Sequence, residues 1–152
     1  MYIIRNSRVH GRGVFASQDI PKGTKIIEYV GLKVTKKQAE DIAEKQLHKA
    51  KGKKKIGHVY LFELNSKYDI DGNVSYNPAR FINHSCEPNC YTENILGHIW
   101  IISKKHIKKG DELTYDYGYD LDAAKDHPCL CGAPSCPGFI VSSRVRWRLR
   151  KK

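Results

Sequence analysis

The chain has 152 residues, of which 27 are Lys or Arg and 16 are Asp or Glu, and its formal net charge is +11 at pH 7. Because 40% of the residues are hydrophobic and 10% aromatic, a chain of this length can bury a sizeable core, which excludes a disordered polycation. The sequence has no run of about 18–20 apolar residues and no secretory signal at its start, so we expect an intracellular protein without a membrane partner.

Most of the predicted elements are short β-strands. Runs rich in Ile, Val and Tyr, separated by Gly and Pro, predict strands at residues 2–4, 24–30, 59–64, 99–102 and 112–115. One helix is predicted between residues 35 and 47, where Thr35 and Gln38 have the spacing of a capping box and apolar residues recur at helical spacing. We therefore expect a mostly β fold with few short helices, and a separately stabilised C-terminal piece from about residue 126 onward.

The basic charge is concentrated in two segments. Residues 45–55 contain six Lys, and residues 144–152 contain four Arg and two Lys, with no acidic residue in either segment. The first segment leads into residues 49–57, which contain two Gly and no apolar periodicity and therefore predict an exposed loop. In the second, Arg residues alternate around Trp147, a pattern suited to phosphate contacts and base stacking, although a solvated charged terminus explains it equally simply.

Residues 11–16 match the glycine pattern of dinucleotide-binding folds. That pattern requires a helix after the glycines, but Pro21 and Gly23 follow within ten residues and no amphipathic run intervenes. A tight turn between two strands is the simpler interpretation. The two glycines would also let the backbone approach a ligand closely, with His10 and Arg12 as flanking polar contacts.

Three of the five cysteines lie within eight residues of one another. Cys129, Cys131 and Cys136 are accompanied by Gly and Pro, which favours a tetrahedral zinc site over free surface thiols or a local disulfide. A fourth ligand must then come from elsewhere in the chain. Spacing alone leaves three candidates for it open: Cys86, Cys90 and His127.

Two further stretches are rich in polar and aromatic side chains. Residues 77–90 combine Asn and His with Phe81 and Ile82, which indicates either a polar site on a buried support or a turn with many side-chain to backbone bonds. Farther along, Tyr115, Tyr117 and Tyr119 occupy alternate positions and so share one face of an extended strand. That pattern is more typical of a core or an aromatic ladder than of a catalytic site.

Taken together, these stretches resemble the SET-domain protein-lysine methyltransferases. Residues 10–16 are similar to the opening motif of that family, 80–90 to its central motif, 111–118 to its third motif and the clustered cysteines to its post-SET segment. The resemblance implies small curved β-sheets around a knot-like crossing, with S-adenosylmethionine on one face and the substrate lysine in a channel from the other. It also implies a SET domain at 1–120 with a variable insertion at about 33–58, a post-SET zinc segment at 126–142 and a basic tail at 143–152.

The resemblance implies roles for individual residues. The catalytic residues would be Tyr117, Tyr60 and Tyr115, with Tyr117 beside the transferred methyl group and Tyr115 limiting the product to mainly monomethyl-lysine. The cofactor would be held by His10, Arg12, Tyr60, Asn83, His84, Leu130 and Phe139. One structural zinc ion would be bound by Cys86, Cys129, Cys131 and Cys136, which leaves Cys90 as the remaining thiol.

The implied activity is methylation of a lysine in a protein substrate, and we expect a histone or another basic nucleic-acid-associated protein. We expect a monomer, located in chromatin if the source is eukaryotic and in the cytoplasm or nucleoid if it is prokaryotic. Nucleic acid could contact residues 45–55 and 144–152. The alternative is a basic zinc module that binds nucleic acid without catalysis, but this alternative does not explain the family spacing of Asn83, His84 and Tyr117.

Overall fold

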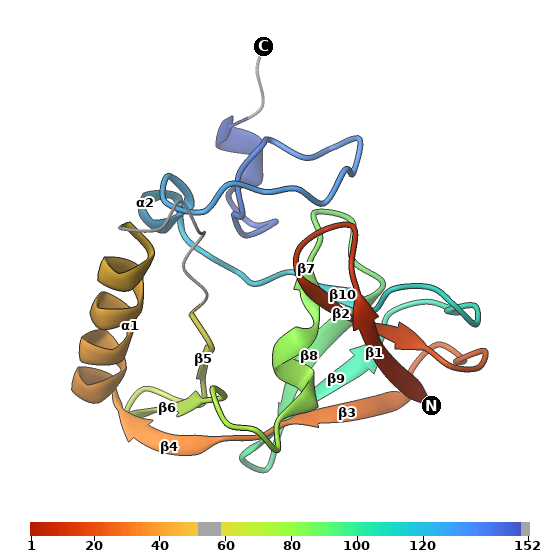
Figure 1. Ribbon diagram of the computed structural model, residues 1–152, viewed down its shortest axis with the longest axis horizontal. Helices are drawn as coiled ribbons and strands as arrows, with labels where there is room; N and C mark the ends of the chain where they lie inside the picture. The colour runs from red at the N-terminus through yellow and green to blue at the C-terminus, as the bar shows by residue number, and fades with distance from the viewer. Residues whose placement is uncertain (52–58, 150–152) are drawn as a thin grey trace.

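The computed structural model of the chain describes residues 1–51 and 59–149 (Figure 1). Within these ranges the chain forms four small β-sheets, two α-helices and two 3-10 helices, so the predicted fold class is confirmed. None of the helices in the described ranges is long and apolar enough to cross a membrane. The knot-like crossing implied by the family resemblance stays a prediction.

Two of the sheets have three antiparallel strands each. The first contains, in spatial order, β3 (Lys25–Tyr29), β9 (His98–Ser103) and β8 (Cys90–Ile95). The second contains β4 (Leu32–Thr35), β6 (Tyr68–Asp71) and β5 (Leu61–Glu63). The first sheet supplies much of the core, because Ile27, Ile99 and Ile101 on it are buried.

The other two sheets are pairs of strands. β1 (Tyr2–Asn6) and β2 (Arg12–Ala16) are antiparallel, whereas β7 (Asn83–His84) and β10 (Thr114–Tyr115) are parallel. The second pair joins the stretches that resemble the central and third motifs. Just before β7, the 3-10 helix η1 (Pro78–Phe81) packs against β2 and β3.

Helix α1 (Lys36–Lys51) begins at the predicted capping box. The Thr35 backbone N–H donates to Gln38 Oε1 at 2.9 Å, and the Gln38 N–H donates to Thr35 Oγ1 at 3.3 Å. The helix packs beside β4 and β6 (Figure 1) and runs to Lys51, so residues 49–51 are helical rather than part of the predicted loop. Lys is a good helix former, and a run of Lys therefore does not end a helix. The rest of that predicted loop, 52–57, lies outside the described residues.

Strands β2, β4, β6, β7 and β8 are missing from the sequence prediction. The sequences of β2, β4, β6 and β8 contain Gly, Asp, Asn or Lys, and β7 consists only of Asn and His, so all five lack the continuous β-like composition that marks β3 and β9. The turn predicted at residues 11–16 is limited to its first glycine, Gly11, at φ +50°, and β2 begins at Arg12. Because β2 contains the second glycine, Gly13, and continues to Ala16, this segment is not followed by a dinucleotide-binding helix.

The C-terminal segment folds back on the rest of the chain. It contains α2 (Leu121–Ala124), capped by Asp120, and the 3-10 helix η2 (Arg146–Leu149). In Figure 1 this segment, drawn in blue, lies over the end of the molecule where β7 and β10 pair. The Ser142 N–H donates to the Tyr119 carbonyl at 2.7 Å, which attaches the segment to the chain that follows β10.

Candidate active site and metal centre

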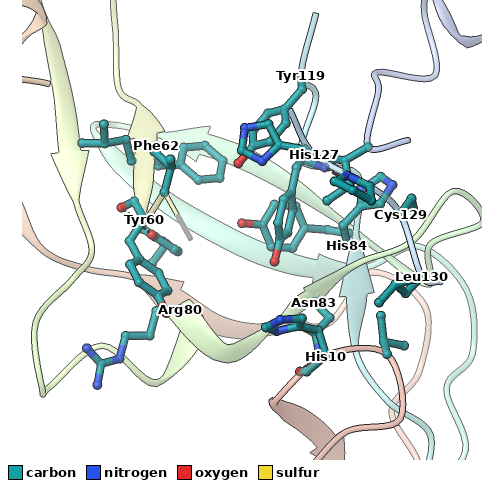
Figure 2. Close-up of a pocket in the computed structure, with 18 of the residues that line it drawn as sticks. His10, Tyr60, Phe62, Arg80, Asn83, His84, Tyr119, His127, Cys129 and Leu130 are labelled. Carbon is teal, nitrogen blue, oxygen red and sulfur yellow. Dashed lines mark hydrogen bonds between the residues drawn. The ribbon is translucent and has the colours of Figure 1, made fainter. Parts of the chain in front are cut away.

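One pocket brings together most of the side chains predicted to be functional. Of the nine residues predicted to be catalytic or cofactor-binding, seven line it: His10, Tyr60, Asn83, His84, Tyr115, Tyr117 and Leu130. Figure 2 shows His10, Asn83 and Leu130 gathered at one side of the pocket and Tyr60 and Phe62 at the other. Residues from five separate regions of the chain therefore meet in one cavity.

Arg12 and Phe139 lie outside this lining. Arg12 is exposed and its guanidinium carbon lies 4.4 Å from the centroid of the Phe81 ring. Phe139 is 38% exposed and forms a β-bridge with Pro128. The cofactor contacts that the resemblance implies for these two side chains stay predictions.

Asn83 is held by the glycine loop and by the third motif. Its Nδ2 donates to the carbonyl oxygens of His10 and Arg12, at 3.3 and 3.1 Å, and to Glu112 Oε1 at 2.7 Å. A Cβ atom at Gly13 would meet the Glu112 carboxylate, so a larger residue there would push this carboxylate away from Asn83. The glycine pattern thus serves close approach of the backbone to the site.

Aromatic rings form a continuous wall along the pocket. Ring centroids of Tyr115 and Tyr117 are 5.0 Å apart and those of Tyr117 and Tyr119 are 5.9 Å apart, which confirms the predicted common face. Phe62 extends the wall at 6.3 Å from Tyr115, and His127 extends it at 4.7 Å from Tyr119. Burial raises the pKa of Tyr119 to about 12 and the pKa values of the other two phenols well above their usual value, so all three are neutral at pH 7.

Tyr117 is bonded on both its hydroxyl and its backbone. The hydroxyl donates to the Ile82 carbonyl at 2.8 Å, so its oxygen keeps lone pairs for other contacts. The Tyr117 N–H donates to His84 Nδ1 at 3.1 Å. Burial lowers the pKa of His84 to about 4, so its imidazole is neutral at pH 7 and carries its hydrogen on Nε2, which lies 3.5 Å from Cys86 Sγ.

The opposite side of the pocket depends on Tyr29. This side chain is buried and its hydroxyl donates to the Tyr60 carbonyl at 2.7 Å. A Cβ atom at Gly72 would overlap the same hydroxyl, so the chain approaches Tyr29 closely only because this residue is glycine. Tyr29 thereby positions the backbone of Tyr60, whose own side chain lines the pocket.

Four sulfur atoms form a candidate metal centre beside the pocket. All lie within 4.8 Å of one another, and the residues are the predicted set Cys86, Cys129, Cys131 and Cys136. The Cys86 and Cys129 sulfurs are 3.9 Å apart. Zinc–sulfur bonds of about 2.3 Å in a tetrahedron place the sulfurs roughly 3.8 Å apart, so the donor set fits one zinc ion. With all four positions taken by protein, such an ion is structural.

The other two candidates for the fourth ligand lie elsewhere. Cys90 is 1% exposed on β8, where its thiol donates to Asn89 Oδ1 at 3.5 Å and burial raises its pKa to about 12. His127 packs against Tyr119 and lines the pocket instead. Spacing could not choose among the three candidates, and the tertiary structure selects Cys86.

The pocket-lining residues that sequence reasoning did not assign to the site include Tyr29, Phe62, Arg80, Tyr119 and His127. Tyr119 carried a signal, since it completes the alternating series with Tyr115 and Tyr117. Tyr29 and Phe62 carried none, because an aromatic residue within an apolar strand also fits an ordinary core.

The predicted basic tail is not uniformly exposed. Trp147 is 64% exposed and Arg148 is exposed, but Arg146 between these and the body of the protein is only 6% exposed. A charged side chain with so little solvent contact requires partners within the protein. The interpretation of the tail as a solvated terminus is therefore wrong at Arg146.

Comparison with known proteins identifies a domain and several relatives. The SET domain family matches residues 11–118. The chain is 40% identical over 141 residues to "Histone-lysine N-methyltransferase trr" of Drosophila melanogaster and 40% identical over 144 residues to "Histone-lysine N-methyltransferase 2D" of Homo sapiens. It is also 40% identical over 138 residues to "Histone-lysine N-methyltransferase, H3 lysine-4 specific" of Schizosaccharomyces pombe. These matches cover 88–90% of this chain but only 6%, 2% and 14% of the respective relatives.

Replacing one predicted zinc ligand tests the metal centre. Cys131→Ser should reduce bound zinc from one ion per chain to near zero and lower the Tm by about 5 °C or more, because the ion ties the C-terminal segment to Cys86. Metal content is measured by mass spectrometry after gel filtration. Cys90→Ser is the matched control, since serine can still donate to Asn89, and it should retain the full zinc content; loss of zinc in this control would contradict the assignment.

Proposed function

The chain belongs to the SET-domain family, and from this premise we propose that it transfers methyl groups from S-adenosylmethionine to a lysine side chain of a protein substrate. The observation that supports this most is the shared pocket, where Asn83 and His84 of the central motif face Tyr115 and Tyr117 of the third. Because the Schizosaccharomyces pombe relative is named as specific for lysine 4 of histone H3, a peptide around that lysine is the first substrate to test.

The reaction requires alignment more than acid or base strength. Bound S-adenosylmethionine supplies a methyl group on a positively charged sulfur, and a neutral amine must meet that carbon in line. Burial raises the pKa of Tyr117, so its phenol stays protonated at neutral pH and does not act as a base. Its hydroxyl hydrogen is donated to the Ile82 carbonyl, which leaves oxygen lone pairs to orient the amine and stabilise the transferring positive charge.

The wall of tyrosines suits the substrate amine. A free lysine has a pKa near 10.4, and removal from water lowers it, which favours the neutral amine that the reaction needs. Phe62, Tyr115 and Tyr117 provide such a surface, and the hydroxyl groups of the two tyrosines are neutral. The positive charge of the bound cofactor would lower the lysine pKa further.

The other side of the pocket suits the cofactor. We assign cofactor binding to His10, Asn83, His84 and Leu130, which lie on the side away from Phe62 (Figure 2). Tyr60 lies on the same side as Phe62, and we assign its side chain to the lysine channel where it meets the cofactor. His84 is neutral, so it adds no charge repulsion toward the cofactor sulfonium. We keep Arg12 and Phe139 as outer contacts, because neither lines the cavity.

Tyr117→Phe tests the catalytic assignment. The variant keeps the aromatic ring but loses the hydroxyl, so kcat should fall by about 100-fold or more, while the Kd for S-adenosylmethionine changes only about threefold or less. Transfer of labelled methyl groups and titration calorimetry measure the two quantities. Tyr91→Phe on β8, where the tyrosine is exposed, is the control and should remain fully active. Normal turnover by Tyr117→Phe would refute the assignment.

Tyr115→Phe tests control of the product. We propose mainly monomethylation, because the Tyr115 hydroxyl takes up room in the buried wall that an already methylated amine would need. Removing it should shift the products of long incubations toward di- and trimethyl-lysine, as read by mass spectrometry of the peptide. Prompt trimethylation by the unmodified protein would contradict this proposal.

We also propose that the exposed part of the tail contacts nucleic acid. Trp147 is 64% exposed, and the Arg148 guanidinium carbon lies 5.4 Å from the centroid of the Trp147 ring. Both side chains can therefore contact a nucleic acid from the protein surface. Arg146 is excluded from this surface because it is buried. The part of the first basic segment beyond Lys51 lies outside the described residues.

The double variant Trp147→Ala, Arg148→Ala tests this surface. It should weaken binding to a DNA duplex by about tenfold at low salt, with a shallower dependence on salt concentration, while methylation of a free peptide stays unchanged. Fluorescence anisotropy across a salt series measures the binding. Unchanged DNA affinity would mean that the tail is a solvated surface only.

A further inference from the structure

Arg146 places a buried guanidinium between the metal centre and the third motif. The residue begins η2 and is 6% exposed. Its Nη1 donates to the Cys86 carbonyl at 2.6 Å, its Nη2 lies 3.2 Å from Asp116 Oδ2, and its Nε and Nη2 donate to the Val141 carbonyl at 3.3 and 3.0 Å. All three nitrogens of the guanidinium are therefore bonded inside the protein.

The three acceptors come from functionally different parts of the chain. Cys86 is one of the four cysteines of the metal centre. Asp116 stands between Tyr115 and Tyr117, and its carboxylate balances the charge of the buried guanidinium. Val141 is fully buried and follows Ile140, which lines the pocket. One rigid fork-shaped group thus spans three segments, which the single ammonium of a lysine could not do.

Asp116 passes this restraint to the backbone around Tyr117. Its Oδ1 accepts the Gly118 N–H at 3.0 Å, and its Oδ2 accepts the Ser143 N–H at 2.8 Å as well as the Arg146 contact. Asp116 Oδ1 also lies 3.8 Å from His84 Nδ1, the atom that accepts the Tyr117 N–H. Asp116, directly before Tyr117, is therefore bonded to Ser143 and Arg146 of the C-terminal segment, and Asp116 in turn binds the backbone of Gly118, directly after Tyr117.

We propose that Arg146 is a positioning residue for methyl transfer. It sets the orientation of the Tyr115–Tyr117 segment through Asp116, and through the Cys86 carbonyl it links that segment to the zinc site. This inference rests on the proposed methyltransferase function, because the segment it positions carries the tyrosine assigned to the reaction. Arg146 itself does not line the pocket and touches no reacting atom.

Two substitutions at Arg146 and one control test this role. Arg146→Met should lower kcat for the histone H3 peptide by about 10- to 100-fold, with KM for the peptide and for S-adenosylmethionine within about threefold of the unmodified protein. Arg146→Lys keeps the charge beside Asp116 and should recover part of the rate. Arg144→Met removes an exposed cation from the same segment and should retain the full rate. A kcat for Arg146→Met within about twofold of that control would overturn the proposal.

A double-mutant cycle separates positioning through Asp116 from general support of the fold. If Arg146 acts through Asp116, the variant Arg146→Lys, Asp116→Asn should lose no more activity than the more damaged single variant. Additive losses in kcat, each matched by a fall in Tm, would instead show independent structural roles and overturn the proposal. The lysine and asparagine substitutions nearly preserve side-chain size, so the coupling between the two residues can still be measured even if Arg146→Met does not fold.

Zinc release provides a readout that does not depend on activity. Transfer of zinc from the protein to a coloured chelator should be about tenfold faster in Arg146→Met than in Arg144→Met, because the Cys86 carbonyl loses its donor. Equal release rates would overturn the proposed link to the metal centre. If the unmodified protein neither binds S-adenosylmethionine nor methylates any basic protein, the proposed function is wrong. The zinc-release rates would still test whether Arg146 stabilises the metal centre through the Cys86 carbonyl.

Discussion

The parallel pairing of β7 with β10 is the contact on which the rest of the site depends. Only two residues on each strand pair, Asn83 with Thr114 and His84 with Tyr115. Such a short ladder supplies little stability by itself, but the half-buried Asn89 supports it. Asn89 Nδ2 donates to the Glu112 carbonyl at 2.8 Å, and its Oδ1 accepts the Thr114 N–H at 2.9 Å. This pairing holds the central and third motifs in one cavity.

Around this pairing, buried side-chain hydroxyls form hydrogen bonds inside the protein, and their acceptors are main-chain carbonyl groups. The hydroxyls of Tyr117 and Tyr29 donate to the carbonyls of Ile82 and Tyr60. The phenols are neutral and so is His84, so the wall of the pocket gains no charge at pH 7. A neutral, aromatic wall is what an amine must meet if it is to react in its unprotonated form.

The C-terminal segment completes the pocket from outside the matched SET domain. Leu130 and Ile140 supply part of the lining, and the four-cysteine centre fixes the loop between them to Cys86. Arg146 adds a second connection to the same residue. The basic residues of this segment therefore lie in two different environments, because Arg146 is buried and bonded inside the protein while Arg148 is exposed.

The sequence by itself determined what depends on neighbours along the chain: the capping box of α1, the alternating tyrosines, the three clustered cysteines and the order of the motifs. Only the tertiary structure decided which distant groups meet these residues. Cys86 lies 43 residues before Cys129, and spacing could not prefer it to Cys90 or His127. The roles of Tyr29 and Arg146 were equally hidden, because a buried side chain takes its function from its partners, and those partners are close only after the chain has folded.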